Sequence, residues 1–144
     1  MKLAAFTLLV AMIGLTEAKM QNVTVKGIAI CDKHRMNNVL VELWEKDTLD
    51  PNDLLASVHT NHNGEFTLKG GDDEITAIQP YIKFKHHCKV SIKPDQVCTR
   101  KTEYDVPAQY INGEYSRKKS IISSYVTLDI VAAGEKEKCE KIKN

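Results

Sequence analysis

The sequence has almost no imbalance of charge, few aromatic residues and no second long apolar run after its N-terminus. Its 144 residues carry 20 Lys and Arg against 19 Asp and Glu, a formal net charge of +1. This balance leaves no global positive field that would steer nucleic acid to the chain. Residues 19–144 also lack an amphipathic stretch long enough for a substantial helix, which excludes a parallel sheet joined by crossover helices.

The N-terminal residues 1–18 have the three regions of a secretory signal peptide. Lys2 gives a positive start, residues 3–15 form an apolar run, and Thr16-Glu17-Ala18 places small residues at the −3 and −1 positions of a cleavage site. The apolar run is too short for a transmembrane segment, which needs about 20 apolar residues. We therefore expect a secreted, extracellular protein with no transmembrane segment and one domain over residues 19–144.

The cysteines of the chain are few but even in number, and all four follow residue 18: Cys31, Cys88, Cys98 and Cys139. In an exported chain this predicts two disulfides. Three pairings are possible, and the sequence alone does not choose between them. Asn22-Val23-Thr24 is a sequon, so Asn22 is a candidate glycosylation site.

Short runs of alternating apolar and polar residues, separated by Gly, Pro and Asn, predict β-strands. Asn63-Gly64 is a strong hairpin signal and predicts that residues 54–60 fold back onto residues 65–69. Residues 72–79 are ambiguous, with room for a short helical turn. Seven to eight strands in this arrangement indicate an all-β, antiparallel β-sandwich of Ig-like type. The predicted strands span 22–30, 38–46, 54–60, 65–69, 81–87, 99–106, 115–122 and 123–132.

Several motifs along the chain resemble the nematode transthyretin-like family. The most specific are His86-His87-Cys88 at the end of a strand and Asn63-Gly64-Glu65-Phe66 in a turn. The resemblance covers nearly all of residues 19–144 and further includes Val25-x-Gly27, Val39-x-Val41-x-Leu43, Lys46-Asp47-Thr48-Leu49, Cys98-x-Arg100-Lys101, Val106-Pro107 and Tyr110-Ile111.

The resemblance implies a transthyretin-type sandwich of two four-stranded sheets. In that fold the strands next to Cys88 and Cys98 are neighbours, which implies a Cys88–Cys98 bridge and, with it, a Cys31–Cys139 bridge. A relative of transthyretin is a hydroxyisourate hydrolase whose site includes a C-terminal Tyr-Arg-Gly-Ser. This chain ends in Glu140-Lys141-Ile142-Lys143-Asn144 instead, so we do not expect that activity.

Other catalytic or metal chemistry has little support in the sequence, and we expect neither an enzyme nor a cofactor. There is no Gly-x-Ser-x-Gly elbow, and oxidised cysteines are not nucleophiles. Histidines occur as His59-x-x-His62 and His86-His87, but adjacent strand residues point to opposite faces. Surface and structural roles for these histidines are therefore favoured over a metal site.

The basic residues suggest a binding face. Lys83, Lys85 and His87 alternate along one strand, Arg100 and Lys101 lie on the next, and Arg117-Lys118-Lys119 forms a second cluster. An ordinary solvated sheet face would look similar. We expect a non-enzymatic extracellular binding protein whose partner is an anionic lipid head group, a cell-surface receptor or another protein. The alternative is an oligomeric carrier with a channel for a small hydrophobic ligand.

Overall fold

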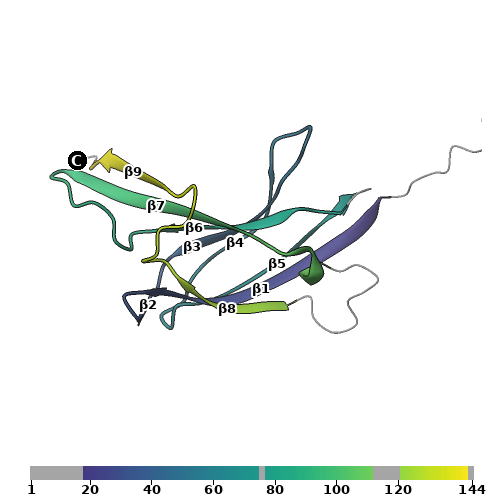
Figure 1. The fold of residues 1–144 in the computed structure, drawn as a ribbon, viewed down its shortest axis with the longest axis horizontal. Coiled ribbons are helices and arrows are strands. Elements are labelled where there is room, and N and C mark those ends of the chain that lie inside the picture. Colours follow the sequence, from purple (N-terminus) through teal and green to yellow (C-terminus); the bar gives the residue numbers. More distant parts are fainter. Residues whose placement is uncertain (1–17, 75–76, 112–120, 143–144) are drawn as a thin grey trace, which may run out of the picture.

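The computed structural model describes residues 18–74, 77–111 and 121–142, and these residues form two packed β-sheets (Figure 1). Among them no helix is both long and apolar enough to cross a bilayer. Residues 1–17 of the predicted signal peptide, residues 115–120 of the predicted strand 115–122 and the Arg117-Lys118-Lys119 cluster lie outside the described residues. In chain order the described elements are β1 (Lys19–Cys31), β2 (His34–Arg35), β3 (Leu40–Glu45), β4 (Asp53–His59), β5 (Glu65–Glu74), β6 (Pro80–His86), β7 (Gln96–Asp105), a short 3-10 helix η1 (Ala108–Tyr110), β8 (Ile121–Thr127) and β9 (Lys136–Lys141).

The first sheet is built around the long strand β1. Strand β5 and the two-residue β2 pair antiparallel with β1, while β8 pairs with the edge of β1 opposite to β5. The β1–β8 pairing is parallel, although the sequence predicted antiparallel pairing throughout. No crossover helix is needed, because the chain between β1 and β8 passes through four strands of the second sheet, β3, β4, β6 and β7.

The second sheet is antiparallel with the strand order β4-β3-β6-β7-β9. Its last strand, β9, comes from the lysine-rich tail and pairs with β7 from Gln96↔Lys141 to Lys101↔Lys136. The sequence predicted the all-β sandwich correctly but placed no strand in this tail.

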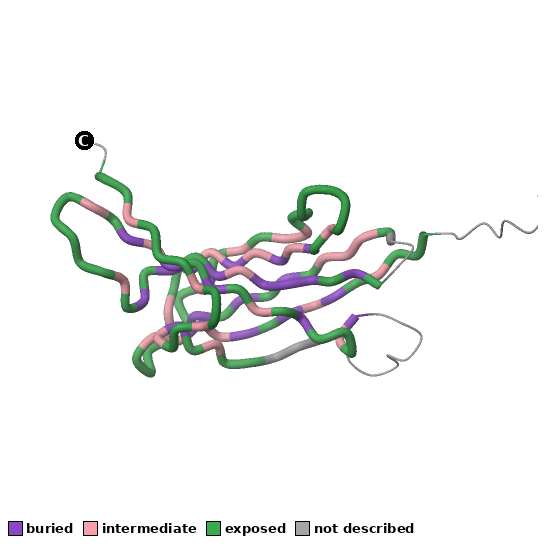
Figure 2. Tube along the Cα trace, turned by 45° about the horizontal axis from the view of Figure 1, so that its top comes forward, coloured by how far each residue is buried: buried purple, intermediate pink, exposed green. Residues whose placement is uncertain are grey.

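Alternating residues of the facing strands fill the space between the sheets. On β6 the side chains of Ile82, Phe84 and His86 face inward and are all at least nine-tenths buried. The Phe84 ring lies edge-on to Phe66 from the first sheet, with the ring centroids 5.5 Å apart. Such aromatic pairs add about 0.5–1.5 kcal/mol beyond the apolar area that they bury. In Figure 2 the buried segments accordingly run through the middle of both layers.

The Asn63-Gly64 turn forms, but the predicted pairing across it is wrong. Gly64 has φ +72°, and the Asn61 side chain accepts hydrogen bonds from the backbone N–H of Asn63 and of Glu65, each at 2.9 Å. The turn nevertheless carries the chain from one sheet to the other, because β4 pairs with β3 whereas β5 pairs with β1. A tight turn fixes a reversal of direction and leaves the choice of partner strand to packing.

Two disulfides are present, as predicted, but the pairing implied by the resemblance is wrong. The bridges join Cys31 to Cys88 and Cys98 to Cys139. Strands β6 and β7 are indeed neighbours, yet β6 ends at His86 and the chain then turns Cys88 inward toward the end of β1. Cys98 is on β7 and lies directly opposite Cys139 on β9, which pairs with the edge of β7 that faces away from β6. One bridge therefore ties the two sheets together, and the other fastens β9 to its neighbour.

Candidate functional site

The predicted basic patch divides between two faces of the second sheet. Lys85 lies opposite Lys101 in the β6–β7 register, on the solvent face. Arg100 lies opposite His86 on the inner face and is only 3% exposed, so its assignment to the surface patch is wrong. The physical reason is the period of two along a strand, which sends the adjacent residues Arg100 and Lys101 to opposite faces.

Two other members of the predicted patch have local partners. The Lys83 ammonium lies 4.4 Å from the centre of the Trp44 ring and 3.5 Å from a Glu103 carboxylate oxygen. His87 donates a hydrogen bond from Nδ1 to the backbone carbonyl of Cys98 at 2.8 Å. The charge of Lys83 is therefore largely compensated, and His87 helps to hold the loop that follows β6.

Strand β9 supplies a lysine that the sequence analysis did not include. Lys136 lies opposite Lys101, which lies opposite Lys85, so three lysines stand side by side across β6, β7 and β9. We call these residues the lysine row. Within the part of the chain that the structure describes, none of the three forms an ion pair with a carboxylate. Like charges placed directly opposite one another destabilise a sheet, so a bound anion would relieve this arrangement.

A cleft of about 190 Å³ adjoins the lysine row. It is lined by Lys85, Thr99, Lys101, Lys138 and Glu140. Lys138 is held by Glu140 at 2.7 Å, and this exposed pair has little stabilising effect. The cleft therefore offers two uncompensated ammonium groups and a hydroxyl, which are donors suited to a phosphate or carboxylate.

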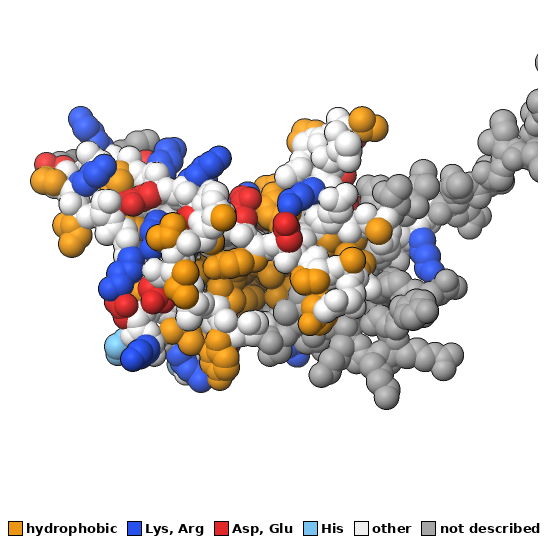
Figure 3. Space-filling view, viewed as in Figure 1, with side chains coloured by type: hydrophobic (Ala, Val, Ile, Leu, Met, Phe, Trp, Pro, Cys, Tyr) orange, Lys and Arg blue, Asp and Glu red, His pale blue; other side chains and the backbone are white. Residues whose placement is uncertain are grey.

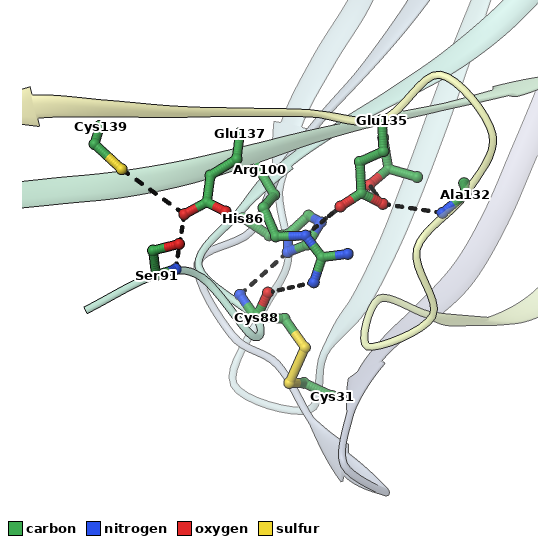
Figure 4. Close-up of polar contacts among 10 residues, drawn as sticks. Cys31, His86, Cys88, Ser91, Arg100, Ala132, Glu135, Glu137 and Cys139 are labelled. Carbon is green, nitrogen blue, oxygen red and sulfur yellow. Dashed lines mark hydrogen bonds and ion pairs between the residues drawn. A yellow bond between two sulfur atoms is a disulfide. The ribbon is translucent and has the colours of Figure 1, made fainter. Parts of the chain in front are cut away.

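Beneath the lysine row lies a buried polar network that fixes β9 (Figure 4). Arg100 forms an ion pair with Glu135, and both side chains are 4% exposed. Arg100 Nη1 also donates to the Cys88 carbonyl at 2.9 Å, while Thr102 and the backbone N–H of Ala132 donate to Glu135 at 3.0 and 3.2 Å. The network sets the start of β9, and with it the position of Lys136.

The pKa values of the buried groups follow from these contacts. Burial raises the pKa of the Glu135 carboxyl, but hydrogen bonds from Arg100, Ala132 and Thr102 outweigh it and leave the pKa below its usual value. Burial and the neighbouring Arg100 charge lower the pKa of His86 to about 4. His86 is thus a neutral structural residue at physiological pH. The sequence analysis missed Glu135 because a Glu in a tail that alternates Glu and Lys looks like a solvated residue.

The remaining candidate residues are not drawn together into a metal site. His59 is exposed at the end of β4, and His62 is exposed in the turn that follows. Across the described residues, the only close group of three possible ligands is Cys98, Glu137 and Cys139, and its two cysteines are joined in a disulfide. Asn22 is exposed on β1, and its glycosylation stays a prediction.

A second cavity opens between the two sheets. It has a volume of about 250 Å³, and its apolar floor is visible near the middle of Figure 3. Strands of both sheets contribute to its walls, which include Val25, Phe66, Phe84, Tyr104, Pro107 and Val126. Its lining is mainly apolar with a few polar residues, as in ligand pockets.

Comparison with known proteins agrees with the fold. The model of the transthyretin-like family (TTR-52) matches residues 26–107. Transthyretin-like protein 16 of Caenorhabditis elegans is 50% identical over 123 residues, covering 85% of this chain and 86% of the relative. Transthyretin-like protein 46 of the same organism is 41% identical over 133 residues, covering 90% and 73%. The resemblance seen in the motifs is thereby confirmed, and the chain belongs to the transthyretin-like family.

Proposed function

We propose that this protein is a secreted, non-enzymatic binding protein that recognises anionic lipid head groups through the lysine row. The observation that carries the proposal is the line of Lys85, Lys101 and Lys136 across three neighbouring strands, without carboxylate partners among the described residues. The two disulfides are consistent with an extracellular compartment.

The geometry suits a surface more than a deep pocket. The lysines stand side by side on a sheet face, so they can approach a plane of head groups together. Each lysine close to an anionic membrane surface contributes about 1 kcal/mol, and the attraction weakens as salt shortens the range of the field. Three such residues give a binding free energy that is measurable at low salt and modest at physiological salt.

The test is binding of the oxidised domain, residues 19–144, to vesicles of phosphatidylcholine with and without phosphatidylglycerol across a salt series. The variant Lys85→Glu/Lys101→Glu removes two members of the lysine row. The matched control, Lys26→Glu/Lys69→Glu, makes the same change in net charge on exposed residues of the first sheet.

We expect salt-sensitive binding to the anionic vesicles only, weakened at least tenfold in the lysine-row variant and much less in the control. Equal losses of vesicle binding in both variants would mean that binding depends on the net charge of the protein and not on the lysine row. Absence of binding at every salt concentration would refute the proposal and favour a protein receptor.

The cavity between the sheets supports a second candidate, a carrier of a small hydrophobic ligand. Its apolar walls lie within one chain, so this version does not depend on a channel formed by oligomerisation. Titration with a fluorescent fatty acid tests it, using Val126→Trp to fill the space between the sheets. Saturable binding that this variant abolishes would support a carrier, and unchanged binding would place the ligand elsewhere.

A further inference from the structure

An isoleucine stands almost fully exposed on the loop between β6 and β7. Ile92 is 99% exposed, and the flanking sequence is Lys89-Val90-Ser91-Ile92-Lys93. Single exposed apolar residues are ordinary on protein surfaces. The surroundings of Ile92 set it apart, because two further apolar residues and several lysines lie at the same end of the molecule.

The two further apolar residues are Val97, at the start of β7, and Ile142, just after β9. They are 49% and 55% exposed. The backbone N–H of Ile142 donates to the Asp95 carbonyl at 2.9 Å, which continues the β7–β9 register and holds the two residues at the same end of the sheet. This end projects beyond the sandwich, where β7 begins and β9 ends (Figure 1). We call Ile92, Val97 and Ile142 the apolar tip.

Val97 and Ile142 continue the face that carries the lysine row, whereas Ser91, next to Ile92, donates to Glu137 on the other face of β9. On β7, Val97 precedes Thr99 by two residues and Lys101 by four, so the period of two places these side chains on the same face. Ile142 follows Lys136 by six residues and lies just past the end of β9, so by the same period it lies on the face of Lys136. Lys138 lies between the lysine row and the tip. This face of the sheet therefore carries two apolar side chains at its end with ammonium groups behind them, and the Ile92 loop lies at the same end.

The loop that carries Ile92 is tied to the body of the protein. The Ser91 backbone N–H donates to Glu137 at 2.7 Å, and the Cys31–Cys88 bridge anchors the start of the loop. The Cys98–Cys139 bridge fastens the two strands that follow. Ile92 is therefore presented to solvent by a braced structure.

We infer that the apolar tip inserts into the acyl region of an anionic bilayer while the lysine row contacts its head groups. This inference rests on the proposed function and names the bilayer, not a free anion, as the partner. Apolar side chains flanked by cations bind at the boundary between head groups and acyl chains, because each part of the surface meets a matching layer. Burying one isoleucine side chain corresponds to roughly a 10- to 100-fold gain in affinity.

The experiment compares the oxidised domain with Ile92→Ser and with a matched control, Leu49→Ser. Leu49 is 94% exposed on the loop between β3 and β4, away from the apolar tip. Each protein is titrated with the phosphatidylcholine–phosphatidylglycerol vesicles described above, and its urea midpoint is recorded to show that it folds. A second readout uses vesicles with brominated acyl chains, which quench tryptophan. Quenching of Ile92→Trp is compared with that of the parent protein, whose one tryptophan is Trp44.

We expect Ile92→Ser to weaken vesicle binding about tenfold or more, Leu49→Ser to leave it unchanged, and the brominated chains to quench Ile92→Trp selectively. Parent-like binding by Ile92→Ser, together with a loss in Lys85→Glu/Lys101→Glu, would overturn insertion and leave head-group recognition standing. A loss in Ile92→Ser alone would keep insertion and overturn the role of the lysine row. Binding to heparin but not to vesicles would overturn both.

Discussion

The buried ion pair between Arg100 and Glu135 makes a sharp stability prediction. Both side chains are 4% exposed, and Glu135 also accepts hydrogen bonds from Thr102 and the Ala132 amide. Removing one partner of such a pair leaves an uncompensated charge in a medium of low polarity. We expect Glu135→Ala to lower the free energy of unfolding by about 3–5 kcal/mol. For a domain of this size that is a large share of a typical total of about 5–15 kcal/mol.

The assay is urea unfolding of the oxidised protein, with both disulfides intact in every variant. Glu137→Ala is the matched control, because Glu137 lies two residues further along β9, is exposed, and accepts one hydrogen bond from Ser91. We expect it to cost about 1 kcal/mol or less. The double variant Arg100→Met/Glu135→Leu removes both charges together and should recover most of the loss. A cost below about 1 kcal/mol for Glu135→Ala would refute the reasoning, since it would mean that Arg100 is not buried with an unpaired charge.

The same pair gives a pH dependence of definite sign. The folded-state pKa of Glu135 lies below its unfolded value, so its contribution is present above the unfolded pKa and is lost as the pH falls through the folded pKa. Protonation at low pH should therefore mimic part of the Glu135→Ala effect. Stability measured against pH should fall less steeply at acid pH in the double variant than in the parent.

Three further predictions follow from other parts of the structure. The pKa of His86 is lowered from 6.5 to about 4, so the parent protein should lose about 3 kcal/mol of stability as the pH falls from about 6.5 to 4. His86→Gln should make the free energy of unfolding, measured with urea, depend less on pH over this range. An unchanged slope would exclude a neutral buried His86. Proteolysis of the unreduced protein should release peptides joined by Cys31–Cys88, and recovery of a Cys88–Cys98 peptide by mass spectrometry would contradict the fold. Gly27→Ala should destabilise by about 1–3 kcal/mol, because the added methyl carbon would lie 2.6 Å from the Phe66 ring; an unchanged urea midpoint would show that the ring moves freely.

The sequence predicted strands best where one face is buried. Strand β6 reads as a strand because Ile82, Phe84 and His86 alternate with lysines, and alternation reports burial directly. Strand β9 gives no such signal, since Lys136–Lys141 carries charge on both faces and only Cys139 breaks the run. An edge strand with many lysines avoids pairing with other molecules, and the same composition hides it from a search for hydrophobic periodicity.

In the candidate site, too, the features set by nearby residues could be predicted from the sequence, and those set by contacts between distant segments could not. The sequence pattern grouped Lys85 and Lys101 with Arg100 and could not separate them, because the burial of Arg100 depends on Glu135, thirty-five residues away. The lysine row also needs Lys136, which joins it only through the β7–β9 register. Likewise, the Cys98–Cys139 disulfide depends on the pairing of β9 with β7. This pairing joins segments far apart in the sequence, so the local sequence around either cysteine does not predict it.

Strand β9 links the stability of the protein to its proposed activity. The Arg100–Glu135 pair and the Cys98–Cys139 bridge hold the two ends of β9 against β7. The outward side chains between these anchors include Lys136 and Lys138, and the strand leads directly to Ile142 in the apolar tip. Any change that loosens β9 should therefore weaken vesicle binding even when it touches no surface residue. For this reason a binding defect in Glu135→Ala or Cys139→Ser does not identify a contact residue, whereas Lys101→Glu and Ile92→Ser change outward side chains and leave both anchors in place.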